Sequence, residues 1–409
     1  MVRSLRVLLA ISALLTAVLA QPAIAKSTLP APSVSFARFD LSGGTRANLS
    51  YGSGVLTLAS GQTQGTWTSP EQTPGFAFDE LVASWNATTP DATWIQIDMV
   101  ATGSGRTTKA YVMGKWTSAA DPAHRTSVPA QGDADGFVAI DTFVRSKKAA
   151  PLTSYHLVVT LNGTAAASPA VRFVGAMTSA AVQKYAIPSP QAYGAAELTD
   201  VPMYSQEIHA GHFPEYDGGG EAWCSPTSTA MIVDYWHAGP TPAELAAFPA
   251  TGETDGQVDF TARGVYDWNY QGAGNWPFNA AYAATRVVAQ GQPSAGLPLN
   301  AFVTRLRSLN EAEQFIKAGI PLVASINGRL PGFFFGKTNG HLLTIVGFTA
   351  SGDVISKDPA VPTDAEVRRI YGRADFEDVW LGGSGGIVYV IYANNMNLPP
   401  NTANVPANW

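Results

Sequence analysis

Short segments with β-strand character fill residues 34–176, and they constrain the fold of this chain more than any other feature. Each segment is rich in β-branched or aromatic residues and is bounded by Gly, Pro, Ser or Asp. Trp94, Gln96 and Asp98 alternate with apolar side chains, as in a strand whose two faces differ. Many strands at this spacing predict an all-β sandwich. The expected strands are residues 35–41, 54–59, 65–69, 78–86, 94–101, 109–117, 136–144, 155–162 and 171–176.

The character of the sequence changes after residue 176. Residues 177–198 are rich in Ala, Pro, Ser and Gln without clear periodicity, which predicts a linker between a sandwich domain at residues 26–176 and a second domain at 199–409. The second domain mixes helical and strand patterns, so we expect an α+β fold there. Loops are expected from residue 237 to a helix at residues 279–290, and Asn310 with Glu313 resembles the capping box of a further helix.

The first 25 residues have the features of a signal peptide. Arg3 and Arg6 precede an apolar run at residues 7–20, and residues 23–25 form a small-x-small cleavage site. The apolar run is too short for a comfortable membrane span, and no later segment is long and apolar enough. We therefore expect a secreted, extracellular protein that begins near Lys26 and has no membrane span.

The charge and cysteine content limit the classes of partner and site. Only 14% of the residues are charged and the net charge is −6, which excludes a basic nucleic-acid surface. The single cysteine, Cys224, rules out an internal disulfide. The chain has no glycine-rich phosphate loop of the required form, so we expect no cofactor.

Cys224 lies where a glycine-rich loop meets a helix. Three glycines precede it at residues 218–220, and Ser225, Pro226 and Thr227 are typical of a helix start. The unpaired N–H groups and the dipole at such a position favour a thiolate. An inert buried thiol is the commoner fate of a free cysteine, but a lone thiol in an exported chain calls for a functional reason.

A histidine and an aspartate lie near the open end of a predicted hairpin. His341 begins an apolar run at residues 341–348, a Ser-Gly-Asp turn follows, and Asp358 ends the return strand. If Phe348 pairs with Val354, then Asp358 faces Thr344, three residues short of His341. A bulge or a strong twist would have to close that gap.

These residues fit the needs of nucleophilic catalysis by a thiol. Cys224 requires a base, for which His341 is the best candidate, and Asp358 can orient the imidazole. The Cys224 backbone N–H and the side-chain amide of Gln206 can serve as oxyanion donors. Four such residues at element boundaries of one domain form a stronger combination than any one of them.

The region from about residue 198 to residue 392 resembles the C39-like cysteine peptidases, which have a papain-like fold. The resemblance rests on VPMYSQ at residues 201–206, WCSP at 223–226, GHLLTIVGF at 340–348 and KDP at 357–359. It implies that Cys224 is the nucleophile, His341 the general base and acid, Asp358 the orienting carboxylate, and Gln206 the oxyanion donor. A peptide or protein would be the substrate, with cell-wall peptides among the candidates.

The spacing of this chain differs from that of the better-known members. Gln206 and Cys224 are 18 positions apart, whereas the glutamine lies nearer the cysteine in the peptidase domains of bacteriocin exporters. Those domains are also attached to a membrane transporter. We therefore do not infer from the resemblance that this chain cleaves after a double-glycine leader. The whole layout, with signal peptide, sandwich and C39-like domain, resembles the secreted C39-family peptidases of actinobacteria.

Two other functions are compatible with this sequence. The triad would catalyse acyl transfer, as in a transglutaminase-like enzyme, if an amine replaced water in attacking the thioester. Alternatively, the C-terminal domain is a relic and the sandwich binds a cell-wall glycan or protein. Trp67, Trp85 and Trp116 are the candidates for a sugar-stacking platform, although core tryptophans are the commoner case.

Two further features have a functional and a structural interpretation. The three phenylalanines of residues 333–335 form either a wall or lid of the active site or a loop that folds back into the core. His209 and His212 have acidic neighbours in a loop, but none of the candidate third ligands is anchored on a regular element. We therefore expect no metal site.

Overall fold

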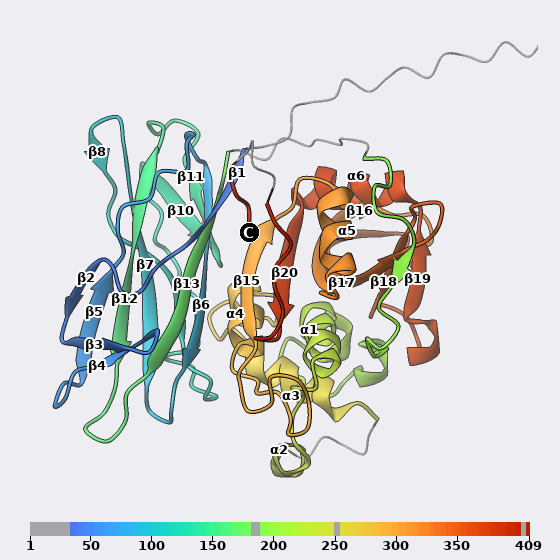
Figure 1. Ribbon diagram of the computed structural model, residues 1–409, viewed down its shortest axis with the longest axis horizontal. Helices are drawn as coiled ribbons and strands as arrows, with labels where there is room; N and C mark the ends of the chain where they lie inside the picture. The colour runs from blue at the N-terminus through green and yellow to red at the C-terminus, as the bar shows by residue number, and fades with distance from the viewer. Residues whose placement is uncertain (1–32, 181–188, 249–253, 402–405) are drawn as a thin grey trace, which may run out of the picture.

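The structure is a computed structural model, and it describes residues 33–180, 189–248, 254–401 and 406–409 (Figure 1). The expected signal peptide, residues 1–25, lies outside these ranges, as does the middle of the expected linker, residues 181–188. Within the described ranges, no helix combines the length and the apolar character that a membrane span requires.

The N-terminal half consists of two antiparallel sheets packed face to face, at the left of Figure 1. Burial alternates along the central strand β12, which points Tyr155, Leu157 and Val159 into the core, as the period-two pattern predicts. The first sheet has the order β10-β11-β6-β13-β4-β3 with β1 beside β13, and the second has the order β2-β5-β12-β7-β8 with β9 beside β7. The first sheet contains β1 (Val34–Arg38), β3 (Leu49–Gly52), β4 (Val55–Leu58), β6 (Glu80–Thr88), β10 (Gly136–Ala139), β11 (Thr142–Arg145) and β13 (Ala170–Ser179). The second contains β2 (Thr45–Ala47), β5 (Gln64–Thr68), β7 (Trp94–Gly103), β8 (Arg106–Thr107), β9 (Tyr111–Trp116) and β12 (Ser154–Asn162).

One expected strand is two strands in the structure. Residues 136–144 form the hairpin of β10 and β11, with Ile140 at φ 61° in the turn. Asp141 explains the turn, because its buried carboxylate accepts a 2.8 Å hydrogen bond from the Trp276 backbone N–H of the C-terminal half. The turn between β10 and β11 therefore lies where Asp141 is hydrogen-bonded to the C-terminal half.

The three tryptophans considered for sugar stacking lie in the interior. Trp67, Trp85 and Trp116 are each 0% exposed. A sugar ring stacks only on an aromatic face that solvent can reach, so the platform hypothesis is wrong for these residues and the core interpretation is right.

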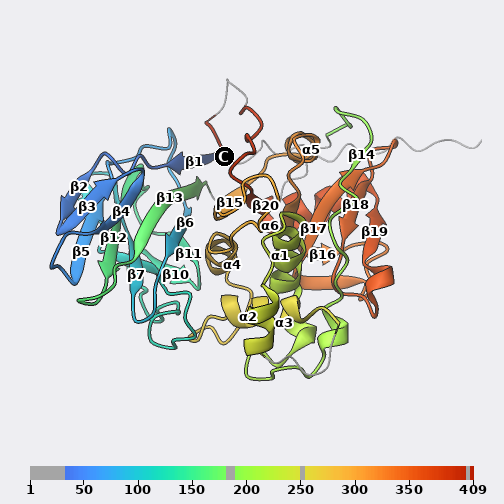
Figure 2. The same cartoon turned by 60° about the horizontal axis from the view of Figure 1, so that its bottom comes forward.

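The C-terminal half is built on a seven-stranded antiparallel sheet with helices packed against it. The strand order is β15-β20-β16-β17-β18-β19, and β14 pairs with β17. Helix α1 packs on β17 and β16, and α3 and α4 pack on α1 (Figure 2). The strands are β14 (Ala196–Glu197), β15 (Asn300–Arg305), β16 (Leu322–Arg329), β17 (Lys337–Phe348), β18 (Val354–Lys357), β19 (Arg368–Tyr371) and β20 (Ile387–Tyr392). The helices are η1 (Glu207–His209), η2 (Gly220–Ala222), α1 (Cys224–Tyr235), α2 (Pro242–Ala247), α3 (Gly256–Val265), α4 (Trp276–Ala283), α5 (Leu309–Lys317), η3 (Asp364–Glu366) and α6 (Arg373–Ser384).

Two helices occupy a region that we expected to be loops. Helix α2 begins with a full capping box, in which Thr241 accepts from the Glu244 N–H and Glu244 accepts from the Thr241 N–H. Pro242 follows at the first helical position. Helix α3 begins after Asp255, which has φ 60° and makes no side-chain cap, so its start leaves no comparable signal in the sequence.

The two predicted helix boundaries differ from the observed ones. Helix α4 ends at Ala283 rather than Gln290. The Arg286 side chain donates hydrogen bonds to the carbonyls of residues 238 and 239, and the backbone of residues 286–288 pairs with residues 297–299. Helix α5 is capped by Ser308, whose side chain accepts from the Glu311 N–H. Asn310 is therefore inside the helix and not its cap.

The two halves are joined by two hydrophobic core clusters, each of which contains residues of both halves. Trp85 and Trp116 of the sandwich contact Phe278 of α4, with ring centroids 6.1 and 5.3 Å apart. Polar contacts close the same boundary, including a 2.6 Å bond from Asn86 Nδ2 to the Ala301 carbonyl. The strand β13 also runs to Ser179, and β14 begins at Ala196, so both ends of the expected linker belong to sheets.

Candidate active site

Cys224 is the first residue of α1 and is partly buried. Trp223 precedes it at the N-cap, fully buried, with its indole N–H donating to the Tyr216 carbonyl at 2.6 Å. The Trp223 side chain does not cap the helix, so the N–H groups of the first turn have no acceptor within the helix. Those N–H groups lie at the positive end of the helix dipole, next to the Cys224 side chain.

Hydrogen bonds hold α1 against the sheet at the point where His341 lies. Ser228, one turn after Cys224, donates to the Leu342 carbonyl at 3.2 Å. Ser225 and the Tyr389 hydroxyl lie 2.9 Å apart. Because Ser228 lies on the same helical face as Cys224 and Leu342 adjoins His341, this docking places the thiol beside the imidazole.

A β-bulge brings His341 and Asp358 together. The pairing of β17 with β18 shifts by one residue at Val346. This shift moves the position opposite Asp358 from Thr344 to Leu343, which points to the same face of the sheet as His341. Asp358 and His341 are thus diagonal neighbours across the strands, and His341 Nε2 lies 2.8 Å from Asp358 Oδ1.

The imidazole of His341 lies between the carboxylate and the thiol. It is 4% exposed, and because Nε2 faces Asp358, the nitrogen left for Cys224 is Nδ1. Burial lowers the pKa of His341, but the charge and hydrogen bond of Asp358, aided by the interaction with Cys224, raise the pKa by more. The arrangement therefore favours the protonated, positively charged form of the His341 ring.

Asp358 is fully buried and its oxygens are well supplied with donors. Besides His341, it accepts from the Ala360 N–H at 3.0 Å and from the Tyr371 hydroxyl at 2.6 Å. Burial raises the pKa of Asp358, but the His341 charge and these hydrogen bonds lower the pKa by a larger amount. The net shift is downward, so the carboxylate stays ionised. Sequence reasoning did not identify Tyr371, because its isolated position in β19 carries no motif.

Gln206 lies on the same site despite its distance from Cys224 in the sequence. It is 3% exposed, and its backbone N–H donates to the Pro359 carbonyl at 2.9 Å. The intervening segment folds back, so Gln206 Nε2 donates to the Glu221 carbonyl at 2.7 Å. Gly220 permits this fold, because a Cβ there would lie 2.3 Å from the Gln206 carbonyl oxygen and 2.4 Å from the His209 carbonyl carbon.

A carboxylate competes for the second hydrogen of the Gln206 amide. Gln206 Nε2 also donates to Glu207 Oε1 at 3.1 Å. Burial and the charge of Glu221 raise the pKa of Glu207, whereas the Gln206 hydrogen bond lowers it, and the net shift is upward. An oxyanion at this site would replace Glu207 as the acceptor of this hydrogen bond from the Gln206 amide.

A cavity of about 380 Å³ opens over these residues. Cys224, His341 and Gln206 line it together with Gly340, Phe333 and Phe335. The structure thus brings all four predicted site residues to one solvent-accessible cavity or, for Asp358, directly behind it.

The loop of residues 333–335 has one phenylalanine packed in the interior and another at the wall of the cavity. Phe333 folds inward, 6% exposed, with its ring centroid 5.1 Å from that of His341. Phe334 and Phe335 remain 52% and 57% exposed. Phe335 therefore offers an apolar wall to the cavity, while Phe333 packs against the imidazole.

Comparisons with known proteins agree with the two halves. Residues 41–179 match the family model for the Peptidase C39 N-terminal domain, and residues 198–386 match the model for the Peptidase_C39 like family. No curated protein matches the chain.

Two solved structures show only distant similarity. A crystal structure described as a C39-like peptidase from Bacillus anthracis is 18% identical over 48% of this chain and 96% of that chain, with a TM-score of 0.27. The xylan-binding module CBM15 is 12% identical over 36% of this chain and 96% of that chain, with a TM-score of 0.21. The two family models, which together span most of the sequence, show that the chain belongs to the C39-like peptidase family.

Proposed function

We propose that this protein is a secreted cysteine peptidase that cleaves amide bonds in peptides or proteins, with a papain-like arrangement of its C-terminal half. The observation that carries the proposal is the position of His341, with Nε2 on Asp358 at 2.8 Å and the other side of the ring toward Cys224. Membership of the C39-like peptidase family supports the reaction class. The signal-peptide pattern of residues 1–25 supports export.

The first step is attack of the Cys224 thiolate on the carbonyl carbon of the scissile amide. The electron pair of the carbonyl moves onto its oxygen, which the Cys224 N–H and the Gln206 amide stabilise. His341 Nδ1–H then protonates the leaving nitrogen as the C–N bond breaks, which leaves a thioester on Cys224. Asp358 keeps the ring in place and stabilises its positive charge.

Water completes the reaction. Neutral His341 removes a proton from a water molecule as the water oxygen attacks the thioester carbonyl. Collapse of the second tetrahedral intermediate releases the carboxylic acid and returns the Cys224 thiolate beside the imidazolium. The exposed Phe335 at the cavity supports a substrate with an apolar side chain near the scissile bond.

Activity against a peptide mixture tests the proposal. The mature protein should generate new peptide N-termini detectable by mass spectrometry, and Cys224→Ala should abolish them while the circular dichroism spectrum stays the same. His156→Ala is the matched control, because His156 also contacts a carboxylate, Glu71 Oε2 at 3.2 Å, but lies on β12 of the sandwich. Cleavage that persists in Cys224→Ala would refute the mechanism.

Alkylation of the thiol separates a catalytic site from a relic. Iodoacetamide at about pH 6 should modify Cys224 rapidly in the native protein and slowly in His341→Ala, because an ordinary thiol is protonated at that pH. Equal slow rates in both proteins would favour a non-catalytic binding protein. Addition of a primary amine to the peptide assay distinguishes hydrolysis from acyl transfer, since only the latter incorporates the amine.

A further inference from the structure

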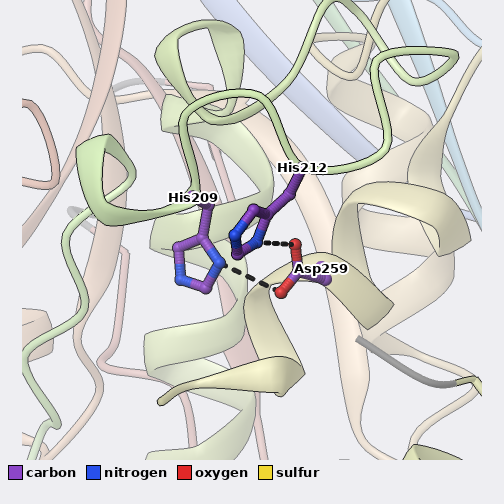
Figure 3. Close-up of side chains that lie close together, drawn as sticks. All are labelled: His209, His212 and Asp259. Atoms are coloured by element: carbon purple, nitrogen blue, oxygen red, sulfur yellow. Dashed lines mark hydrogen bonds and ion pairs between the residues drawn. The ribbon is translucent and has the colours of Figure 1, made fainter. Parts of the chain in front are cut away.

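Two histidines and an aspartate form a buried cluster about the loop that carries Gln206 (Figure 3). His209 Nδ1 lies 3.0 Å from one oxygen of Asp259, and His212 Nδ1 lies 3.1 Å from the other. His209 and Asp259 are fully buried, and the His212 side chain is 18% exposed. Asp259 lies on α3, so the third residue is anchored on a helix, contrary to the sequence-based expectation.

The separations in this cluster are close to those of a metal site. One nitrogen from each histidine and one oxygen from Asp259 lie within 4.8 Å of one another. A tetrahedral Zn²⁺ at about 2.0–2.1 Å from each ligand holds neighbouring ligand atoms about 3.3 Å apart. The N···O distances of 3.0 and 3.1 Å, each to a different oxygen of Asp259, fall within a few tenths of an ångström of that value, and coordination through one shared oxygen requires a shift of the side chains.

One ring nitrogen of His209 has no hydrogen-bond partner among the described residues. This atom, Nε2, is buried. Nothing on that side of the ring therefore holds the proton on Nδ1, so Nδ1 can present its lone pair to a metal while the proton moves to Nε2. Asp259 contributes a carboxylate whose two oxygens each face a histidine ring.

We propose that His209, His212 and Asp259 form a binding site for a divalent transition metal, with Zn²⁺ as the expected ion. Two imidazoles and one carboxylate suit Zn²⁺ and its neighbours, whereas Ca²⁺ and Mg²⁺ require mostly oxygen ligands. Three protein ligands leave a fourth position for water on the side of His212, which is the side that solvent reaches.

The bound metal would fix the loop that positions the oxyanion donor. His209 ends η1, whose first flanking residue is Gln206, and Asp259 belongs to α3, which packs on the Cys224 helix. The His209 ring also lies against Trp223, with centroids 6.4 Å apart. A metal at this point would join the loop to the helix layer behind the nucleophile without touching the substrate.

Metal binding is measured in a Cys224→Ala background, so that the thiol and His341 cannot provide a competing site. After removal of metal with a chelator and dialysis, this protein should take up one equivalent of Co²⁺, with a visible absorption spectrum of a four-coordinate ion, and one equivalent of Zn²⁺ by elemental analysis. Added His212→Ala should weaken binding at least about 100-fold, since loss of even an outer-shell partner costs 10- to 100-fold. Added His124→Ala should leave it unchanged, because His124 lies in the sandwich half, where it contacts Asp121 at 2.6 Å and stacks on Trp94.

Asp259→Asn provides a second variant, which keeps the size of the side chain and removes its charge. It should also weaken metal binding, and circular dichroism checks that each variant is folded. Failure of the Cys224→Ala protein to bind Co²⁺ or Zn²⁺, or a melting temperature that does not rise with added metal, would overturn the proposal whatever the variants do. Binding that survives His212→Ala unchanged would overturn it too. Because Cys224 is absent throughout, these outcomes are independent of peptidase activity.

Discussion

Substitution of Gly220 by alanine should damage catalysis without touching any reacting group. Gly220 lies in η2, and the atoms that face its missing side chain belong to the backbone of the Gln206 loop. An added Cβ would lie 2.3 Å from the Gln206 carbonyl oxygen, whereas ordinary contacts begin at 3.4 Å. The loop must therefore move by about 1 Å, because the three nearest atoms, in Gln206, His209 and Ala210, are all main-chain atoms that cannot rotate away.

The size of the effect follows from that displacement. A shift of about 1 Å in a catalytic group costs on the order of 100-fold in rate, which corresponds to about 2.7 kcal/mol in the activation free energy. Removal of one oxyanion donor from other enzymes costs about 100- to 1,000-fold. We therefore expect Gly220→Ala to lower kcat/KM by about 100-fold, close to the effect of Gln206→Ala.

Two assays identify the cause of this loss. A fluorogenic peptide derived from a cleaved sequence gives kcat/KM, and iodoacetamide alkylation reports the Cys224–His341 pair, which α1 and β17 hold independently of the loop. Gly220→Ala should reduce the first and spare the second. Gly52→Ala is the control, because a Cβ at Gly52 meets no atom within 4 Å. A Gly220→Ala enzyme with wild-type kcat/KM would show that the Gln206 loop does not take part in the reaction.

Three further predictions concern the groups around the triad. Phe335→Ser should raise KM for peptides with apolar side chains several-fold, whereas Phe334→Ser should not, because Phe335 lines the cavity and Phe334 does not. An equal effect of both in steady-state kinetics would contradict this. The lowered pKa of Asp358 means that its stabilising contribution is present above about pH 4, the ordinary aspartate value, and is lost as the pH falls through its folded pKa. The melting temperatures of wild type and Asp358→Asn should thus differ most near neutral pH and converge in acid, and a constant difference would refute the assignment. Tyr371→Phe removes a hydrogen bond to a buried charge and should lower the free energy of unfolding by about 1.5–3 kcal/mol in urea titrations, and no change would show that the bond contributes nothing.

The sequence predicted the hairpin of His341 and Asp358 but not its register. The pairing from the turn leaves Asp358 on the wrong face of the sheet, and one extra residue at Val346 corrects this. Gly347, next to the bulge, was the available signal, because an isolated glycine in a strand often marks a bulge or a close approach of another backbone. Here it marks both, since a Cβ on Gly347 would lie 2.4 Å from the Ala196 carbonyl oxygen of β14.

Sequence reasoning named His209 and His212 as candidate ligands but missed Asp259, for a different reason. Asp259 lies 50 positions after His209, on a helix without a side-chain cap. Only the packing of α3 on α1 brings the carboxylate to the histidines. Local patterns predict elements, but the contacts between elements follow from how the whole core closes.

The core clusters that join the two halves have a consequence for how the protein must be handled and how it evolves. Phe278 of α4 fills a space walled by Trp85 and Trp116 of the sandwich, so a fragment cut between the halves would expose a large apolar surface on both sides. The sandwich is accordingly a part of the folding unit rather than a detachable accessory. Exchanging it for the equivalent segment of a distant homologue would require matched changes on α4, and the two halves are therefore expected to be inherited as a pair.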